Sequence, residues 1–349
     1  MTSRHRAAGA GSGLTCSVVM PTVAWDGCFE DCAQRVLELL ERPEVQADSF
    51  LVVFDGVPPA TPTWLTQSPA QLLATGHRSG PAVARNLAAE RAAGDILVFV
   101  DADVQLHHDA LGRIRRHFEV DPRLDAVFGS YDDRPAAPGL VSQFRNLLHH
   151  HTHTSHPGPA CTFWAGCGAM RRSRFLALGG FDRRYERPSI EDIELGMRLA
   201  AAGGRLLLDP AILCTHHKRW SLRSMVVTDI RQRALPWSRL LRRRPHGTVG
   251  LNLTPAARFS GLLTLLLVAC LLALPWAAPA GWGALACLLA LLGLNRRFYA
   301  CCLRVRGPGF LLAAIPLHLL YFSYSSLTYA LVAVEHCWRP ARAPQPAAP

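Results

Sequence analysis

The sequence predicts an α/β fold, in which a doubly wound, mostly parallel sheet is followed by a C-terminal α-helical transmembrane region. Residues 14 to about 250 alternate short apolar runs with charged segments that contain Gly and Pro, as strands and helices alternate in such sheets. The run at 96–100 is apolar throughout, which is typical of a strand buried on both faces of a parallel sheet. From Phe259 onward, long apolar stretches contain almost no acidic residue.

The elements of the expected sheet domain follow one another along the chain. Strands are indicated by short β-rich apolar runs and helices by apolar spacing near 3.6 residues. The expected strands are 16–22, 50–54, 72–75, 96–101, 125–129 and 211–215, and the expected helices are 28–40, 81–93, 110–118 and 191–200. The helix at 81–93 has Pro81 at its first position and Gly94 just after its end, which are the places these residues favour.

Two carboxylates follow the most apolar strand. Asp101 and Asp103 are two residues apart, so in an extended chain they point to the same side. Hard oxygen ligands of this kind suit Mg²⁺ or Mn²⁺, and ligands of open α/β sheets bind at the carboxyl ends of strands. A solvated turn or a helix start would have the same Asp-x-Asp pattern, so this segment alone leaves both interpretations open.

Two more segments are expected at the same edge. Asp55 follows the strand at 50–54 and can accept hydrogen bonds from a base or ribose, although Asp-Gly is also typical of a plain turn. The helix that starts at Gly80-Pro81 would direct free backbone N–H groups and Arg85 towards a diphosphate. The alternative for that helix is an ordinary surface helix with one arginine.

A pair of acidic residues opens the helix expected at 191–200. Glu191 and Asp192 fall in its first turn, where the helix dipole keeps a carboxylate ionised. An ionised carboxylate is what a general base needs to remove a proton from a hydroxyl. Ser189 and Asp192 also have the spacing of a capping box. The two interpretations are compatible.

A basic and aromatic segment, His216-His-Lys-Arg-Trp220, follows the strand at 211–215. Either His216 or His217 can supply a metal ligand. Lys218 and Arg219 can neutralise phosphate oxygens, and Trp220 can stack on a ring. The alternative is an anchor at a membrane surface.

Two segments in the middle of the chain are expected to have different structures. The histidine-rich stretch at 149–156 is predicted to be a mobile loop near the acceptor entrance, because metal ligands need fixed support. The segment 161–168 places Trp164 and Gly166 among small residues, which fits the wall of a sugar pocket or plain core packing.

Three apolar stretches are candidate membrane helices, because a bilayer takes about 20 residues. They are residues 259–277, 282–294 and 310–334, and the middle one is short enough for a re-entrant helix. Arginines cluster before the first stretch and between the second and third, which predicts that both clusters are cytoplasmic. With no signal peptide expected, the catalytic region would lie in the cytoplasm, on a multi-pass protein of the inner (plasma) membrane.

Charge and cysteine content narrow the function classes. The net charge of +11 comes almost wholly from arginine, and anionic lipid headgroups explain it better than nucleic acid does. Eleven cysteines form no pair of CxxC spacings. They are therefore predicted to be buried small hydrophobes or free thiols, and not a zinc site or a disulfide framework.

The expected division of the chain has five parts. They are a disordered tail (1–13), a catalytic domain (14–237), a basic juxtamembrane segment (238–258), two to three transmembrane helices (259–336) and a second disordered tail (337–349).

Together the segments resemble a membrane-associated, bacterial-type family 2 glycosyltransferase of the GT-A fold. The resemblance covers about residues 16–237 and depends on six motifs in this order. They are Ser17–Thr22, Val53–Gly56, Gly80–Asn86, Val100–Asp103, Gly179–Asp182 and Ile190–Asp192.

The resemblance implies a nucleotide-diphosphate sugar donor, with UDP favoured, and one divalent metal, Mg²⁺ or Mn²⁺. It implies that Asp55 contacts the base, Asp101 the nucleotide and Asp103 the metal-bound diphosphate, and that Asp192, beside Glu191, is the base of an inverting displacement. The other residues implied on the donor side are Thr22, Arg85, Asn86, Lys218 and Arg219, with His216 or His217 near the metal. Those implied in the sugar and acceptor pocket are Trp164, Gly166 and Trp220.

The expected activity is transfer of a hexose to a hydroxyl of a lipid-linked or cell-envelope glycan, as in cell wall biosynthesis. Two departures stand out. Processive synthases of this family have Gln-x-x-Arg-Trp, whereas this chain has His216 at the first position, and Val53–Gly56 lacks a second acidic residue. The alternatives are a polyprenyl-phosphate acceptor, which needs no base, and a non-catalytic membrane protein that binds nucleotide sugars. Nucleic-acid binding is disfavoured by the apolar stretches.

Overall fold

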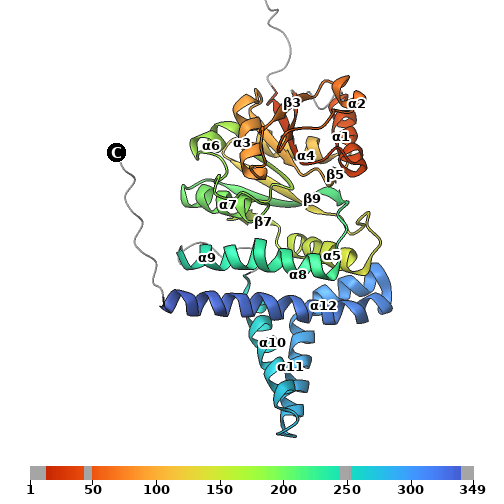
Figure 1. Cartoon of the computed structure of the whole chain (residues 1–349), viewed down its shortest axis with the longest axis vertical. Helices are drawn as coiled ribbons and strands as arrows, with labels where there is room; N and C mark the ends of the chain where they lie inside the picture. Colours follow the sequence, from red (N-terminus) through yellow and green to blue (C-terminus); the bar gives the residue numbers. More distant parts are fainter. Residues whose placement is uncertain (1–12, 43–48, 244–250, 252, 339–349) are drawn as a thin grey trace, which may run out of the picture.

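The computed structural model describes residues 13–42, 49–243, 251 and 253–338. The two tails expected at 1–13 and 337–349 lie almost wholly outside these residues, as does much of the basic segment after 243. The described chain forms one sheet domain, a layer of helices beneath it, and a helical hairpin that projects from that layer (Figure 1).

The sheet has nine strands, and eight of them follow the order β3-β2-β1-β4-β8-β6-β9-β5. The first four in this order are parallel to one another, and the expected α/β class is confirmed. Their bounds are β1 (Cys16–Thr22), β2 (Ser49–Phe54), β3 (Gln71–Ala74) and β4 (Ile96–Val100). The remaining strands are β5 (Val104–Leu106), β6 (Ala126–Tyr131), β7 (Gly158–Ala160), β8 (Cys167–Arg171) and β9 (Leu206–His216).

The second half of the sheet is mixed. Strand β8 runs antiparallel between β4 and β6, while β9 is parallel to β6 and pairs in the opposite sense with β5 and β7. The sequence did not indicate β5, β7 or β8, and β9 begins five residues before the expected strand. This arrangement places Asp101 and Asp103, which follow β4, next to the end of β9.

Helices cover both faces of the sheet, as a doubly wound fold requires. One apolar core joins the sheet to α1 (Gly27–Leu40) and α4 (Ala110–Val120), and the other joins it to α3 (Pro81–Arg91), α6 (Arg172–Ala177) and α7 (Glu191–Ala201). The short helix α2 (Thr63–Thr66) lies between β2 and β3 in sequence. Both cores are built from residues of β1 and β4, whose central side chains are fully buried.

The layer beneath the sheet consists of α5 (Leu140–Thr154), α8 (Leu222–Thr228), the π-helix η1 (Asp229–Ala234), α9 (Leu235–Arg243) and α12 (Arg296–Trp338). Gly307 interrupts α12 with φ 81°, and Pro308 follows it. The part after this break runs crosswise to the hairpin of α10 (Pro255–Ala273) and α11 (Ala280–Leu294) (Figure 1).

Two helices, α10 and α12, are long and apolar enough to cross a membrane by length and composition, and α11 is shorter. The hairpin and the part of α12 after Gly307 run crosswise to each other (Figure 1). Both therefore cannot cross one flat membrane perpendicular to its plane. Buried Asp229 of η1 accepts a hydrogen bond of 2.6 Å from the hydroxyl of Tyr324 on α12 and pairs with Arg145 of α5 at 2.9 Å. The long part of α12 is thereby fixed to α5 and η1 beneath the sheet domain.

Candidate active site

The carboxyl ends of β1, β2 and β4 lie side by side because these strands are parallel and in register. Thr22 ends β1, and its carbonyl accepts a hydrogen bond of 2.8 Å from the backbone of Asp55, which follows β2. Asp101 and Asp103 follow β4. The expected convergence of Asp55 and the Asp-x-Asp pair on one edge of the sheet is therefore observed.

Arg85 on α3 lies at the centre of this edge and is 5% exposed. Its guanidinium donates to Asp101 Oδ1 at 2.6 Å and to Glu191 Oε1 at 3.0 Å. The two carboxylates come from β4 and α7, so Arg85 joins the two halves of the site. Both terminal nitrogens already serve protein carboxylates, which differs from the expected free cation for a diphosphate.

Asp192 is connected to the same edge by a second route. Its Oδ2 accepts a hydrogen bond of 3.1 Å from Ala165 N, and the carbonyl of the next residue, Gly166, accepts one of 3.3 Å from Asp101 N. Residues 165–166 thus hold Asp101 on one side and Asp192 on the other. A Cβ at Gly166 would lie 2.6 Å from the Trp164 ring, so only glycine fits this junction.

Burial raises the pKa of Asp192 to about 7, and the neighbouring charge of Glu191 adds to the effect. Asp192 Oδ1 accepts from the backbone of Ile193 at 2.8 Å. The expected capping box is wrong: the N-cap of α7 is Ile190, and Ser189 Oγ donates instead to Gln232 O at 2.8 Å. Glu191 Oε2 accepts from Ser189 N at 2.8 Å, so the acidic neighbour fixes the helix start.

Asp103 faces His216 at the end of β9. The distance from His216 Nε2 to Asp103 Oδ2 is 3.8 Å, and the imidazole stacks on Tyr131 with ring centroids 4.3 Å apart. Burial raises the pKa of Asp103 and lowers that of His216 to about 3. The imidazole is therefore neutral at pH 7 and leaves the Asp103 carboxylate without an ionic partner on that side.

The other residues of the basic segment, 217–220, lie in different surroundings. His217 lies on the α1 side of the loop, and its backbone donates to Asp103 O at 2.9 Å. Lys218 and Arg219 are exposed, and the Lys218 ammonium lies 4.6 Å from the centre of the Trp220 ring. Trp220 is buried in the cluster that joins α5 to α12, and its contact with a sugar stays a prediction.

Three predicted donor residues have their polar groups engaged by the protein. Asp55 accepts hydrogen bonds from the backbone of Ser79 at 2.8 Å and of Gly80 at 3.0 Å, and so holds the loop before α3. The side-chain amide of Asn86 donates to Phe181 O at 2.8 Å and accepts from Phe181 N at 2.9 Å. The hydroxyl of Thr22 donates to Ala24 O at 2.8 Å. Their direct contacts with a donor stay predictions.

The expected mobile loop at 149–156 is wrong, because the stretch to Thr154 is the last part of helix α5. His150 Nδ1 donates to Tyr131 O at 2.7 Å and His153 Nδ1 to Gly129 O at 2.8 Å, which ties the helix to β6. Trp164 packs against Tyr131 and His149 with centroid distances of 4.8 and 4.5 Å. An aromatic wall therefore borders the site beside Asp103.

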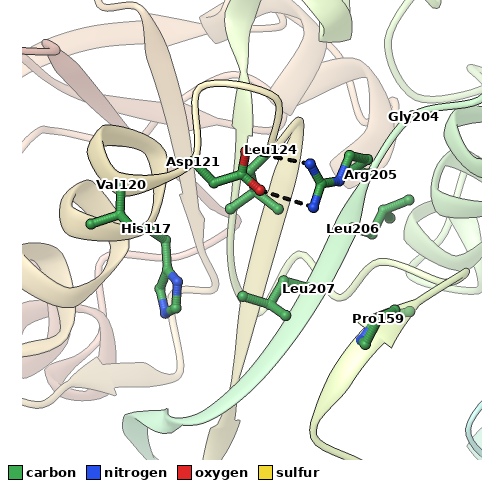
Figure 2. A pocket seen from close by; sticks show the side chains of 10 residues that line it. His117, Val120, Asp121, Leu124, Pro159, Gly204, Arg205, Leu206 and Leu207 are labelled. Atoms are coloured by element: carbon green, nitrogen blue, oxygen red, sulfur yellow. Dashed lines mark hydrogen bonds and ion pairs between the residues drawn. The ribbon is translucent and has the colours of Figure 1, made fainter.

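A hollow of about 290 Å³ lies at a different edge of the sheet, where β9 begins and α4 ends. Figure 2 shows Asp121 paired with Arg205 across it, and the ion pair is 3.0 Å long. None of the predicted site residues lines this hollow.

The chain is similar to known proteins in part of its sequence and in its fold. Residues 17–178 match the family described as Glycosyl transferase family 2. This segment is therefore similar to family 2 glycosyltransferase domains. The matched segment contains Asp55, Arg85, Asp101 and Asp103, and Asp192 lies beyond it.

Two curated relatives, pre-mycofactocin glycosyltransferases from two strains of Mycobacterium tuberculosis, are each 29% identical over 162 residues. The match covers 43% of this chain and spans about a third, 33%, of the length of those relatives.

A mannosyltransferase from Pyrobaculum calidifontis, solved with GDP-mannose and Mn²⁺, superimposes with a TM-score of 0.54 at 19% identity. It covers 94% of this chain and 88% of its own. The sheet domain thus shares the GT-A fold with that enzyme.

The edge of the sheet at Asp103 has groups that fit a divalent cation. Asp103 supplies a partly exposed carboxylate oxygen and His216 a neutral imidazole nitrogen, 3.8 Å apart. A hard cation with few protein ligands keeps positions open for phosphate oxygens. The residues present therefore fit the expected ion, with Asp103 and His216 as the groups that would hold it.

Sequence reasoning missed Tyr131 and Arg233. Tyr131 contributes the ring that stacks on His216, and Arg233 of η1 lies over the Trp220 ring with its guanidinium carbon 5.8 Å from the centroid. Neither stands in a recognisable motif, because each is brought to the site by β6 or η1 through the tertiary fold.

Proposed function

We propose that the protein is an inverting, metal-dependent glycosyltransferase that moves a hexose from a nucleotide-diphosphate sugar to an acceptor hydroxyl at a membrane surface. The observation that carries the proposal is the double connection between the Asp-x-Asp loop and Asp192. Arg85 bridges Asp101 and Glu191, and residues 165–166 bind both Asp101 and Asp192. A carboxylate with a pKa near neutrality stands beside the donor edge.

The chemistry follows from this placement. A divalent cation, when bound at Asp103 and His216, would offset charge on the departing diphosphate. Ionised Asp192 removes the proton of the acceptor hydroxyl. The acceptor oxygen then bonds to the anomeric carbon as the bond from that carbon to the diphosphate oxygen breaks. A single displacement of this kind inverts the configuration.

Arg85 and Glu191 act by positioning. Arg85 holds Asp101 and Glu191 together in a buried site, and Glu191 in turn holds Ser189 N at the start of α7. The charge of Glu191 also raises the pKa of Asp192. These residues therefore fix where the base stands and at which pH it is ionised.

The C-terminal helices support a membrane-bound acceptor. The hairpin of α10 and α11 exposes large apolar side chains, among them Phe259 and Leu272, which are 60% and 67% exposed. If this hairpin enters the bilayer, α12 and α9 lie along its surface beneath the catalytic domain (Figure 1). Arginines precede the hairpin, which supports a cytoplasmic location for the domain. A lipid-linked or cell-envelope glycan acceptor then shares one surface with the enzyme.

The test of this function is nucleoside diphosphate release by full-length protein in lipid vesicles with Mn²⁺ or Mg²⁺, an acceptor lipid extract, and either a UDP-sugar or GDP-mannose. UDP-sugars are the first probes, and GDP-mannose is included because the Pyrobaculum enzyme was solved with it. Release that depends on metal and acceptor is expected. Donor binding without release under any of these conditions would identify a non-catalytic nucleotide-sugar-binding protein.

Asp192→Asn distinguishes the two acceptor chemistries. With a hydroxyl acceptor, loss of the base should lower turnover by about 10³-fold. Asp209→Asn, which changes a carboxylate near the distant hollow, is the matched control and should keep wild-type turnover. A polyprenyl phosphate is already ionised and needs no base, so near-normal turnover of Asp192→Asn would favour that acceptor and contradict the role given to Asp192.

A further inference from the structure

Three side chains that can bind metal meet on the α1 side of the loop that carries Asp103. They are Cys28 and Cys32 of α1 and His217, which follows β9. One ligand atom from each lies within 4.8 Å of the other two. The cysteines are four residues apart on the helix and so share one face, although the sequence alone, lacking paired CxxC spacings, indicated no zinc site.

Hydrogen bonds connect both Cys28 and His217 to the short loop that contains Ala102 and Asp103. The Cys28 thiol donates to Ala102 O at 3.9 Å, and the backbone of His217 donates to Asp103 O at 2.9 Å. The start of α1 is itself capped, since the Asp26 carboxylate accepts from Phe29 N at 2.9 Å. The three groups therefore come together on a framework that is built without any ligand.

The surroundings of the His217 imidazole give independent support for a ligand at this cluster. Its Nε2 is buried and has no hydrogen-bond partner among the residues that the structure describes, and leaving a buried polar atom unpaired is unfavourable. His216, the preceding residue, points its Nε2 towards Asp103 Oδ2. Adjacent residues of an extended chain face opposite sides, so the two histidines serve different clusters.

We propose that Cys28, Cys32 and His217 bind a structural Zn²⁺ ion that fixes α1 and the end of β9 to the Asp103 loop. Zn²⁺ is bound by thiolate and imidazole at about 2.3 and 2.0–2.1 Å in tetrahedral sites. Ligand atoms of such a site are roughly 3.3–3.8 Å apart, so the observed cluster needs to contract by about 1 Å. Water completes the fourth position, and the two thiols lose their protons on binding.

The ligand chemistry separates this site from the one expected at Asp103 and His216. Thiolates select Zn²⁺ and related metals, whereas Mg²⁺ and Mn²⁺ prefer oxygen ligands. A large excess of Mg²⁺ should therefore leave the bound Zn²⁺ in place. The proposal is tested by metal binding, so its outcome is separate from whether the protein transfers sugar.

The experiment is titration of the reduced, metal-free full-length protein with Co²⁺, which takes the place of Zn²⁺ and is coloured. One equivalent should produce a thiolate-to-cobalt charge-transfer band and the d–d bands of tetrahedral cobalt, and one equivalent of Zn²⁺ should remove them. Cys28→Ser and His217→Ala should abolish or strongly weaken the bands. Cys161→Ser, a partly buried cysteine of the same domain, is the matched control and should retain them.

Wild-type protein provides a second readout that does not depend on the variants folding. Zn²⁺ at roughly ten times its Kd should slow alkylation of Cys28 and Cys32 by about tenfold, with no change at Cys161, as mapped by mass spectrometry. The proposal is overturned if no thiolate band appears, if Cys161→Ser loses it equally, or if Zn²⁺ leaves alkylation unchanged. A Cys28–Cys32 disulfide in protein that binds no metal after reduction would also overturn it.

Discussion

The two acidic clusters of the site balance their charge in different ways. In the first cluster, Arg85 lies between Glu191 and Asp101, and all three are held by hydrogen bonds of 2.6–3.0 Å. On the donor side, Asp103 faces His216, which burial keeps neutral by lowering its pKa to about 3. The charges of the first cluster are paired within the protein, whereas the second has a partly exposed carboxylate suited to an added cation. The difference is the reason that we propose positioning for the first cluster and donor binding for the second.

The largest effect is expected from Asp103→Asn. The amide would remove the charged oxygen that holds the cation, at a loss of about 5 kcal/mol of transition-state stabilisation, or roughly 10⁴-fold in turnover. Nucleoside diphosphate release measures it. Asp133→Asn, a partly exposed acidic residue after β6, is the control and should keep activity. If Asp103→Asn retained more than a tenth of wild-type turnover, the donor role would be wrong.

Arg85→Gln should have the next largest effect, which is a lower free energy of unfolding. It leaves Glu191 and Asp101 without their shared cation, and breaking a buried ion pair lowers the free energy of unfolding by about 3–5 kcal/mol. Thermal unfolding in detergent checks this. Arg91→Gln, at the exposed end of the same helix, should change stability by less than about 0.5 kcal/mol. Equal stability of the two variants would contradict the positioning role of Arg85.

The pH dependence is a smaller effect and concerns the acceptor side. Asp192 must be ionised to act as a base, and its pKa is raised to about 7. Turnover should therefore rise with pH through neutrality and fall about fivefold from pH 7 to pH 6. Glu191→Gln removes the neighbouring charge and should shift the profile to lower pH. A wild-type profile that stays flat between pH 5 and 8 would argue against Asp192 as the base.

The parallel half of the sheet was predictable because residues close together in sequence indicate each of its strands. Strands β1, β2 and β4 each contain a run of apolar residues, and the polar residues at or after their ends mark one edge of the sheet. Strand β8 escaped prediction because Gly168 and Ala169 lack the large apolar side chains that indicate a strand. Its place in the sheet comes from pairing with β4 and β6.

The contacts inside the site were not predictable in the same way. The partners of Arg85 are 16 and 106 residues away in sequence, and nothing local to α3 indicates them. Ser189 had the spacing of a helix cap, but its hydroxyl donates a hydrogen bond to the backbone carbonyl of Gln232. The histidines of α5 suggested a loop, and only their hydrogen bonds to β6 show a helix packed on the sheet.

Binding of a nucleotide sugar to two variants tests the division of roles most directly. Calorimetry with Mn²⁺ and the donor identified by the release assay would compare Asp103→Asn with Asp192→Asn. Asp103→Asn should lose donor affinity, whereas Asp192→Asn should bind the donor with wild-type affinity and still fail to transfer the sugar. Equal loss of binding in both variants, or wild-type binding by Asp103→Asn, would contradict the account.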